Sequence, residues 1–267
     1  MTLRVNQRRC EISRFGAELE QAGIAFSVDS HGAIVLGKPV PVQRIPGFAA
    51  GWVSVQDSAA QMAAPLLLAE LTASGNKTLR VLDACAAPGG KTGHILELCD
   101  ATVTAIEKDR DRCPRIHQNL DRLGLKANVL NADAATPQEW WDGEYFDAIL
   151  VDAPCTASGI VRRHPDIRWL RRETDIAQLV ALQKRILNAL WSVLRPGGRM
   201  VYCTCSVFHA EGSGQVQTFL AHNTDARLLP SPGHLMPGPS TKASALPDNR
   251  QRDHDGFFYA LLEKRVG

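Results

Sequence analysis

Two cysteines stand where a thiol could act as a nucleophile. The sequence DAPC places Cys155 just after one apolar segment, and the sequence TCS places Cys205 just after another. If both segments are parallel strands of one sheet, both thiols lie at the same edge of it. A cysteine outside a disulfide is more often a small core residue than a nucleophile, but this shared location favours covalent chemistry for both.

The other cysteines give a weaker signal. We expect Cys10, Cys99 and Cys113 to be core residues. Cys203 lies two residues before Cys205 and points to the same side only if the strand stays regular, and we expect it to be structural. The total of seven cysteines is odd and no two are spaced as CxxC, which argues against a disulfide framework and a zinc ribbon. We predict no metal site.

A glycine-containing turn predicts a cofactor site. Residues 83–92 read DACAAPGGKT and lie between a strand candidate and a helix candidate. In a doubly wound sheet, such a turn lets a ligand approach the backbone at the carboxyl ends of the strands. A dinucleotide site needs GxGxxG, which Gly89-Gly90 does not supply, and a phosphate-binding P-loop needs glycine where Cys85 stands. A P-loop ATPase is kept as an alternative.

Carboxylates that end the next two strands favour S-adenosylmethionine as the cofactor. Glu107 lies 17 residues beyond Gly90, and one carboxylate can accept both hydroxyl hydrogens of a ribose. Asp133, at the end of the third strand, could reach the edge of an adenine. The alternative is that Glu107 and Asp133 only cap helices, as acidic residues after strands often do.

The elements that must position these residues follow from the apolar pattern. Strands are predicted at 79–84, 102–107, 128–131, 146–152 and 199–204, and amphipathic helices around 113–123 and 179–190. Uninterrupted apolar strands that alternate with helices predict a parallel sheet covered on both faces. Residues 230–255 are predicted to be a long surface loop, partly disordered, and residues 256–264 a last strand.

The first 50 residues predict a separate, small α+β unit. Strands are expected at 3–6, 25–28 and 33–36 and a helix at 11–21, before the prolines at 39, 41 and 46 mark a linker. We therefore predict two domains, residues 1–50 and residues 51–267. The fold class is α/β, with a Rossmann-like domain after a small N-terminal α+β domain.

The composition is that of an ordinary globular protein. Of 267 residues, 45% are hydrophobic and 22% are charged, which excludes disordered and fibrous classes. No apolar run is long enough to cross a bilayer, and the arginine-containing N-terminus is not a secretory signal, so a cytoplasmic protein without membrane contact is expected. The net charge of +2 does not by itself indicate a nucleic-acid partner.

Five segments together resemble a known family. They read DACAAPGGKT, DAPC, RRHPDIRWLRR, TCS and DGFFYALLEK, and they resemble the RNA cytosine carbon-5 methyltransferases, in particular the bacterial 16S ribosomal RNA branch called Fmu or Sun. The resemblance covers essentially the whole chain. It implies a class I S-adenosylmethionine-dependent methyltransferase fold and a ribosomal RNA substrate. The expected cofactor-binding residues are Cys85, Ala86, Ala87, Pro88, Gly89, Gly90, Lys91, Glu107, Asp133 and Asp152.

The resemblance also implies catalytic roles. It makes Cys205 the nucleophile that adds to carbon-6 of cytosine, and it gives Cys155 a part in product release. Position in the sequence does not order the two thiols. Asp152 is suited to stabilise the charge that develops on the ring during addition. The rival from another class is a catalytically silent RNA-binding or ribosome-assembly factor, which would need neither thiol nor Asp152.

An arginine-rich segment follows DAPC and could bind RNA. Such a cluster can neutralise phosphates, and Trp169 within it can stack on a base; the alternative is a solvated helix start. The predicted RNA-binding residues are Arg162, Arg163, His164, Arg168, Arg171 and Arg172. We expect a monomer.

The sequence departs from the family pattern in three places. Many members carry an N-terminal helical RNA-binding domain of the NusB kind, and this chain begins after the place where that domain would end. The family usually has Asp at the position of Glu107. The family often has a Glu-Asn pair after TCS, whereas here Gly212 follows Glu211.

Overall fold

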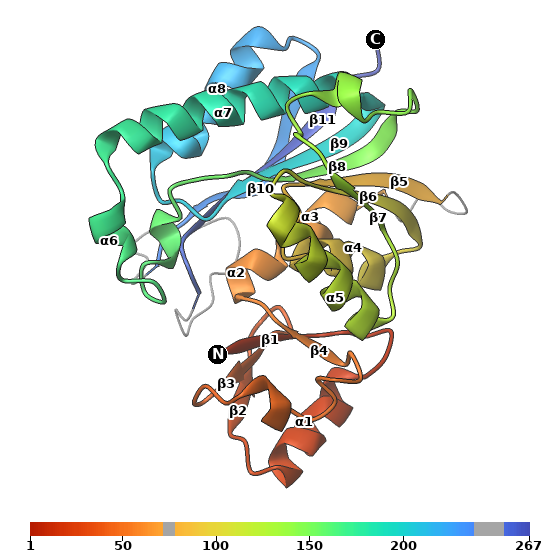
Figure 1. Cartoon of the computed structure of the whole chain (residues 1–267), viewed down its shortest axis with the longest axis vertical. Coiled ribbons are helices and arrows are strands. Elements are labelled where there is room, and N and C mark those ends of the chain that lie inside the picture. Colours follow the sequence, from red (N-terminus) through yellow and green to blue (C-terminus); the bar gives the residue numbers. More distant parts are fainter. Residues whose placement is uncertain (72–77, 238–253) are drawn as a thin grey trace.

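The fold is described from a computed structural model of residues 1–71, 78–237 and 254–267. Two β-sheets lie one above the other in Figure 1, a small one at the N-terminal end and a large one between two layers of helices. No helix within these ranges is long and apolar enough to span a membrane.

The small sheet forms the N-terminal unit. It consists of β1 (Thr2–Val5), β2 (Phe26–Val28), β3 (Ile34–Leu36) and β4 (Val53–Val55), all antiparallel, in the order β2-β3-β1-β4. Helix α1 (Ile12–Gln21) buries Phe15 and Leu19 against this sheet. The predicted strands and helix are confirmed within a few residues, and β4 is a strand that the sequence analysis did not identify.

The large sheet carries the predicted cofactor turn and both predicted catalytic loops. Its strand order is β10-β11-β9-β8-β5-β6-β7. The strands are β5 (Leu79–Ala84), β6 (Ala101–Glu107), β7 (Asn128–Asn131), β8 (Phe146–Asp152), β9 (Leu194–Thr204), β10 (Ala226–Leu235) and β11 (Phe257–Lys264). From β9 to β7 the pairing is parallel, but β11 and β10 run antiparallel to their neighbours. The parallel pairing predicted for the five strands at 79–84, 102–107, 128–131, 146–152 and 199–204 is therefore confirmed, and β10 and β11 add antiparallel pairs that the sequence analysis did not predict.

Helices cover both faces of the large sheet (Figure 1). One layer holds α3 (Ala63–Leu68), α4 (Gly90–Leu98) and α5 (Cys113–Leu123), and the other holds α7 (Glu173–Ser192) and α8 (Ser213–His222). Each helical layer packs on one face of the sheet and forms a separate hydrophobic core. Successive side chains of β8 alternate between these cores, so Leu150 packs in the first and Ile149 and Val151 pack in the second. Short helices are α2 (Ser58–Gln61) and α6 (Ile167–Leu170), and 3-10 turns lie at Val42–Arg44, Arg110–Arg112, Pro137–Glu139, Ser158–Ile160 and His209–Glu211.

The predicted loop at residues 230–255 is wrong for its first part. Strand β10 continues to Leu235, and its register with β11 shifts between Leu229 and Gly233. Pro230 and Pro232 lie within that shift, on the edge strand of the sheet. Proline has no backbone N–H to donate, and an edge strand tolerates this because it has a neighbouring strand on one side only. Residues 238–253 lie outside the described residues. The predicted last strand is confirmed as β11.

Arg4 of β1 joins the N-terminal unit to the cofactor helix. Its guanidinium donates from Nε and Nη2 to the two carboxylate oxygens of Glu97, at 2.9 and 2.8 Å, and from Nη1 to the Gly90 carbonyl oxygen at 2.9 Å. The Arg4 and Glu97 side chains are almost completely buried. The small unit is thus attached directly to the helix that follows the glycine turn.

Candidate active site

The glycine turn has an unusual backbone conformation. Cys85 has φ +62° and Gly89 has φ +92°, both in the left-handed region. Gly89 adopts this conformation without a steric clash because glycine has no Cβ atom. A Cβ atom at Gly89 would also lie 3.1 Å from Ile116 of α5, so the glycine permits close packing against that helix. The turn is tied to the next strand by the Ala86 N–H, which donates to the Ile106 carbonyl oxygen at 2.9 Å.

The turn opens beside a cleft at the carboxyl ends of β5, β6 and β7. Three predicted cofactor residues, Cys85, Glu107 and Asp133, line this cleft together with apolar side chains such as Ile106 and Leu182. Burial and the nearby carboxylates raise the pKa of Cys85, so this cysteine remains a neutral thiol. The structure brings these residues together from three different strand ends.

Glu107 and Asp133 also bond to the backbone, as the capping alternative proposed. Glu107 is 4% exposed, and its two oxygens accept from the Ala87 N–H at 3.2 Å and the Asp109 N–H at 2.9 Å. Asp133 accepts from the Ala135 N–H at 2.9 Å and from Lys108 at 2.8 Å. Burial raises the pKa of Asp133, but the bonds from Lys108 and Ala135 outweigh it and lower the pKa. Each carboxylate oxygen retains a second lone pair for a ligand.

The two predicted catalytic cysteines are in contact. The sulfur atoms of Cys155 and Cys205 lie 3.4 Å apart, at the adjacent carboxyl ends of β8 and β9. The Cys205 carbonyl oxygen accepts from the Gly159 N–H at 2.9 Å, which ties the loop after β8 to the end of β9. The shared edge predicted from the sequence is therefore confirmed.

The two thiols differ in acidity. The hydrogen-bond contact with Cys155 lowers the pKa of Cys205 despite its burial; the charge of Asp152 raises that pKa and the charge of Lys91 lowers it. The same contact, together with burial, raises the pKa of Cys155 well above its ordinary value. Cys205 is therefore the more acidic of the two thiols and the better source of thiolate.

Asp152 and Lys91 form an ion pair beside the thiols. Lys91 Nζ lies 2.6 Å from Asp152 Oδ2, and Cys203 Sγ lies 3.6 Å from Asp152 Oδ1. Burial lowers the pKa of Lys91, but the negative charge of Asp152 outweighs burial and raises it. The sequence analysis grouped Lys91 with the cofactor turn, whereas the structure directs its ammonium group to Asp152.

The remaining cysteines differ in burial. Cys203 and Cys10 are buried, as expected for structural residues, whereas Cys99 and Cys113 are only partly buried. Glu211 is a fully buried carboxylate that contacts the residues after Cys155 and Cys205, the two predicted catalytic cysteines. The sequence analysis named Glu211 only because the family often has a Glu-Asn pair at this place. No local sequence pattern indicates that a residue in this turn will contact the loops at the ends of two strands.

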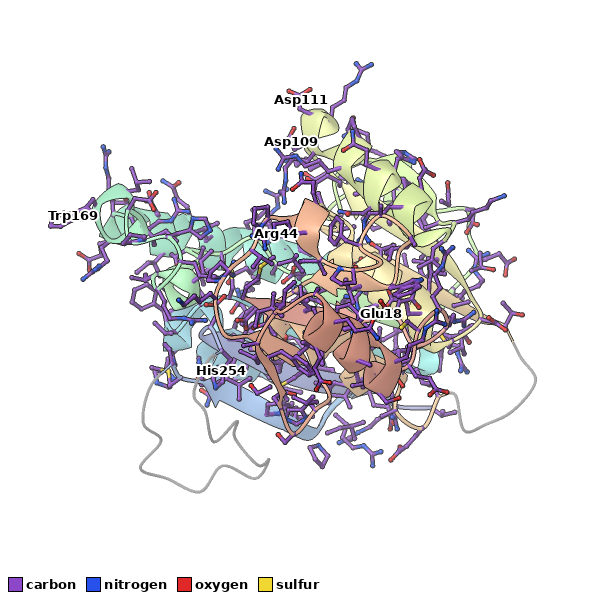
Figure 2. The ribbon with its side chains drawn as sticks, turned by 90° about the horizontal axis from the view of Figure 1, so that it is seen from below. Glu18, Arg44, Asp109, Asp111, Trp169 and His254 are labelled. Carbon is purple, nitrogen blue, oxygen red and sulfur yellow. The ribbon has the colours of Figure 1, made fainter. Side chains whose placement is uncertain are left out.

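The arginine segment divides into two groups. Arg163 pairs with the fully buried Asp255, with Nε 2.8 Å from Oδ2, and Arg171 Nε donates to the Thr156 carbonyl oxygen at 2.8 Å. These two arginines hold the loop after β8. The side chains of His164, Arg168 and Arg172 are exposed. Trp169 on α6 is 87% exposed and projects away from the body of the protein in Figure 2.

Arg162 lies near the same carboxylates as Arg163. Its Nη2 atom is 3.6 Å from Asp255 Oδ1 and 3.9 Å from Asp57 Oδ2. Among the residues that the structure describes, no group of three or more His, Cys, Asp or Glu side chains could hold a metal ion.

Solved structures share this fold. The structure titled "Crystal Structure of PH0851" superposes with a TM-score of 0.85, at 30% identity over 99% of this chain and 59% of that one. A methyltransferase homologue from Pyrococcus horikoshii gives a TM-score of 0.77, at 28% identity over 99% of this chain and 86% of that one. NSun6 from Pyrococcus horikoshii with SFG gives 0.70, at 26% identity over 88% of this chain and 60% of that one. The Rossmann-like methyltransferase fold is thereby confirmed.

Curated proteins that are similar in sequence to this chain are named as ribosomal RNA methyltransferases. Ribosomal RNA small subunit methyltransferase B of Vibrio cholerae serotype O1 is 47% identical over 99% of this chain, and that of Klebsiella pneumoniae is 46% identical over 99%. The chain spans 59% of the length of each of these two relatives. The family model described as 16S rRNA methyltransferase RsmB/F matches residues 70–263. The chain therefore belongs to the RsmB/F family of 16S rRNA methyltransferases.

Proposed function

We propose that this chain transfers a methyl group from S-adenosylmethionine to carbon-5 of a cytosine in 16S ribosomal RNA, through a covalent bond between Cys205 and the base. The observation that carries the proposal is the pair of sulfurs 3.4 Å apart beside the Asp152–Lys91 ion pair. Family membership supports ribosomal RNA as the substrate.

The chemistry explains why such a pair is useful. Carbon-5 of cytosine is a poor nucleophile until a thiolate adds to carbon-6 and breaks the aromaticity. The Cys205 thiolate forms that carbon–sulfur bond, and the electron density moves to carbon-5. We assign to Asp152 the interaction with the ring edge as charge develops there. After methyl transfer, a base removes the carbon-5 proton, the carbon–sulfur bond breaks, and Cys205 leaves as thiolate.

The cleft beside the glycine turn suits the cofactor. Glu107 offers carboxylate oxygens for the ribose hydroxyls, Asp133 lies at the same cleft, and Ile106 and Leu182 supply apolar walls for the adenine. When bound, the cofactor supplies an electrophilic methyl group on a sulfonium. The exposed residues Arg168, Trp169 and Arg172 support RNA binding by charge and stacking. The cytoplasmic location and the monomeric state stay predictions.

The two thiols can be separated by substitution. Cys205→Ala should abolish both methylation and any covalent complex, because no addition can occur. Cys155→Ala should still add to the base but release it poorly, so a protein–RNA adduct should accumulate on a denaturing gel after incubation with cofactor and substrate RNA. An adduct in Cys205→Ala but not in Cys155→Ala would reverse the assignment.

Methylation at the normal rate by both variants would exclude the covalent mechanism. A catalytically silent RNA-binding factor would give no methylation and no adduct with the wild type, whereas RNA binding would persist. Bisulfite mapping of ribosomal RNA from a strain that lacks the gene would identify the modified cytosine.

A further inference from the structure

Glu211 is a fully buried carboxylate at the end of the turn His209–Glu211, between β9 and α8. Its Oε1 atom accepts from the Thr156 N–H at 2.9 Å and from Gln183 Nε2 at 3.1 Å. Its Oε2 atom accepts from the hydroxyls of Thr156 and Ser206, both at 2.6 Å. The four donors satisfy both oxygens in a place that water does not reach.

The partners of Glu211 are the immediate neighbours of the two thiols. Thr156 follows Cys155 on the loop after β8, and Ser206 follows Cys205 at the end of β9. Ser158 strengthens the same link, because its hydroxyl lies 3.1 Å from the Ser206 hydroxyl and accepts from the Val207 N–H at 3.1 Å. One carboxylate therefore joins the two loops that carry the cysteines, which are 50 residues apart in the sequence.

The turn that carries Glu211 is itself fixed to the sheet. The Tyr202 hydroxyl, on β9, donates to the Glu211 carbonyl oxygen at 2.7 Å, and Tyr202 is fully buried. Gln183 of α7 bonds to the Pro154 carbonyl oxygen at 2.9 Å as well as to Glu211. Glu211 is thus held by β9 and α7 as well as by the residues that follow the two cysteines.

We propose that Glu211 is a positioning residue that determines which of the two cysteines keeps its proton. Acting through Thr156 and Ser206, it holds the sulfurs in hydrogen-bond contact. The four donors to its carboxylate are neutral, whereas the carboxylate of Asp152 is paired with Lys91 at 2.6 Å. The charge of Glu211 therefore disfavours a thiolate at Cys155 and makes Cys155 the donor and Cys205 the acceptor. The catalytic meaning of this order rests on the proposed function, but the order itself does not.

The electrostatics agree with this arrangement. The hydrogen bond to Cys205 and burial raise the pKa of Cys155 most, and the charge of Glu211 adds to the rise. The contact with Cys155 lowers the pKa of Cys205, where the raising charge of Asp152 is opposed by the lowering charge of Lys91. A proton moved from Cys155 to Cys205 would place a thiolate near the carboxylate of Glu211, whose four donors are all neutral, and this is the less favourable state.

The test is limited alkylation with iodoacetamide between pH 6 and pH 9, without RNA or cofactor, with each cysteine quantified by peptide mass spectrometry. In the wild type, Cys205 should be labelled before Cys155. In Glu211→Gln, which keeps the shape but removes the charge, the ratio of Cys205 to Cys155 labelling should fall about tenfold, the change in thiolate fraction that follows from one pKa unit.

Asp147→Asn is the matched control. Asp147 is also buried, 1% exposed, but it lies at the opposite end of β8, where it accepts from the Arg80 N–H at 2.8 Å. Its loss should change thermal stability without changing the labelling ratio. An unchanged ratio in a folded Glu211→Gln protein would overturn the proposal, and so would an equal fall in Asp147→Asn.

Ser206→Ala carries the test if Glu211→Gln does not fold. This variant removes one donor to Glu211 beside Cys205, and the labelling ratio should fall in the same direction by a smaller factor. An unchanged ratio there would also overturn the proposal. Because alkylation needs neither RNA nor methyl transfer, a wild type that does not methylate RNA, together with a Cys155→Ala variant that forms no adduct, would refute the proposed function alone.

Discussion

Glu107 is the side chain on which the cofactor prediction depends most directly. Its carboxylate is buried at the cleft and already accepts two backbone N–H groups. Glu107→Gln should weaken S-adenosylmethionine binding about tenfold or more, because a charged acceptor is worth about 1.5–3 kcal/mol. Calorimetry in EDTA gives the dissociation constant. Asp111→Asn, an exposed acid two residues beyond Asp109, should bind as tightly as the wild type.

An unchanged affinity in Glu107→Gln would mean that Glu107 serves only the turn. Binding that disappears in EDTA would contradict the prediction of a cofactor site without metal.

Asp83 should make stability depend on pH. Burial raises its pKa to about 7, although the Thr92 hydroxyl donates to it at 2.6 Å. A carboxyl whose pKa is higher in the folded than in the unfolded state stabilises the fold at low pH and loses that contribution as the pH rises to 7. As the pH rises from 5 to 8, the free energy of unfolding of the wild type should therefore fall by about 3 kcal/mol relative to that of Asp83→Asn, in which this position does not titrate.

Urea unfolding at several pH values measures this difference, with Asp111→Asn as the exposed control. A constant difference across the range would show that Asp83 is ionised in the folded protein throughout.

At the residue scale, the sequence identified the site's reactive groups but not their supports. Cys155, Cys205 and Asp152 stand in short motifs at strand ends. The prediction that they lie close together needed only the prediction that these strands are parallel. Glu211 and Asp255 have no comparable signal, because their partners lie in loops far away in the sequence. The ordering of the two thiols depends on a 3.4 Å contact that spacing alone does not specify.

At the element scale, α6 and the loop before it combine two kinds of arginine. Arg168→Ala on α6 should weaken RNA binding without changing thermal stability. It should also flatten the salt dependence of binding by roughly 0.7–0.9 in log–log slope for each phosphate that is no longer neutralised. Arg163→Ala should lower thermal stability instead, because it leaves the buried carboxylate of Asp255 without this partner. Filter binding at several salt concentrations and a thermal melt measure the two effects.

If Arg168→Ala binds RNA with an unaltered affinity and slope, that side chain is only part of a solvated face. Cofactor affinity serves as the internal control, since neither arginine lies at the cleft of Glu107.

The periodicity of the sequence predicted most elements but not their directions. The strand at residues 146–152 is buried on both faces, and it was found because its interior, residues 148–151, is wholly apolar. β10 was missed because only Ala226 is buried and two prolines interrupt it. β4, a strand of three residues, was also missed. Local composition also does not reveal that β11 pairs antiparallel with β9 and β10.

At the scale of the whole molecule, the attachment of the N-terminal unit rests on a buried ion pair. Arg4→Met leaves the Glu97 carboxylate buried and unpaired, which costs about 3–5 kcal/mol of unfolding free energy. The double variant Arg4→Met with Glu97→Met removes both charges and should recover a large part of that loss. Urea unfolding of the single and double variants measures the coupling between the two side chains. A double variant as unstable as the sum of its singles would show that the two charges act independently.

The order of the large sheet has a consequence for synthesis on the ribosome. β11 lies between β9 and β10, yet it is made after both of them. Until residues 257–264 emerge, β9 has an open edge and β10 has no partner strand. Tyr259 on β11 also donates its hydroxyl to the Ala59 carbonyl oxygen at 2.6 Å, across 200 residues of chain. The nascent chain therefore cannot complete its large sheet before β11 is translated.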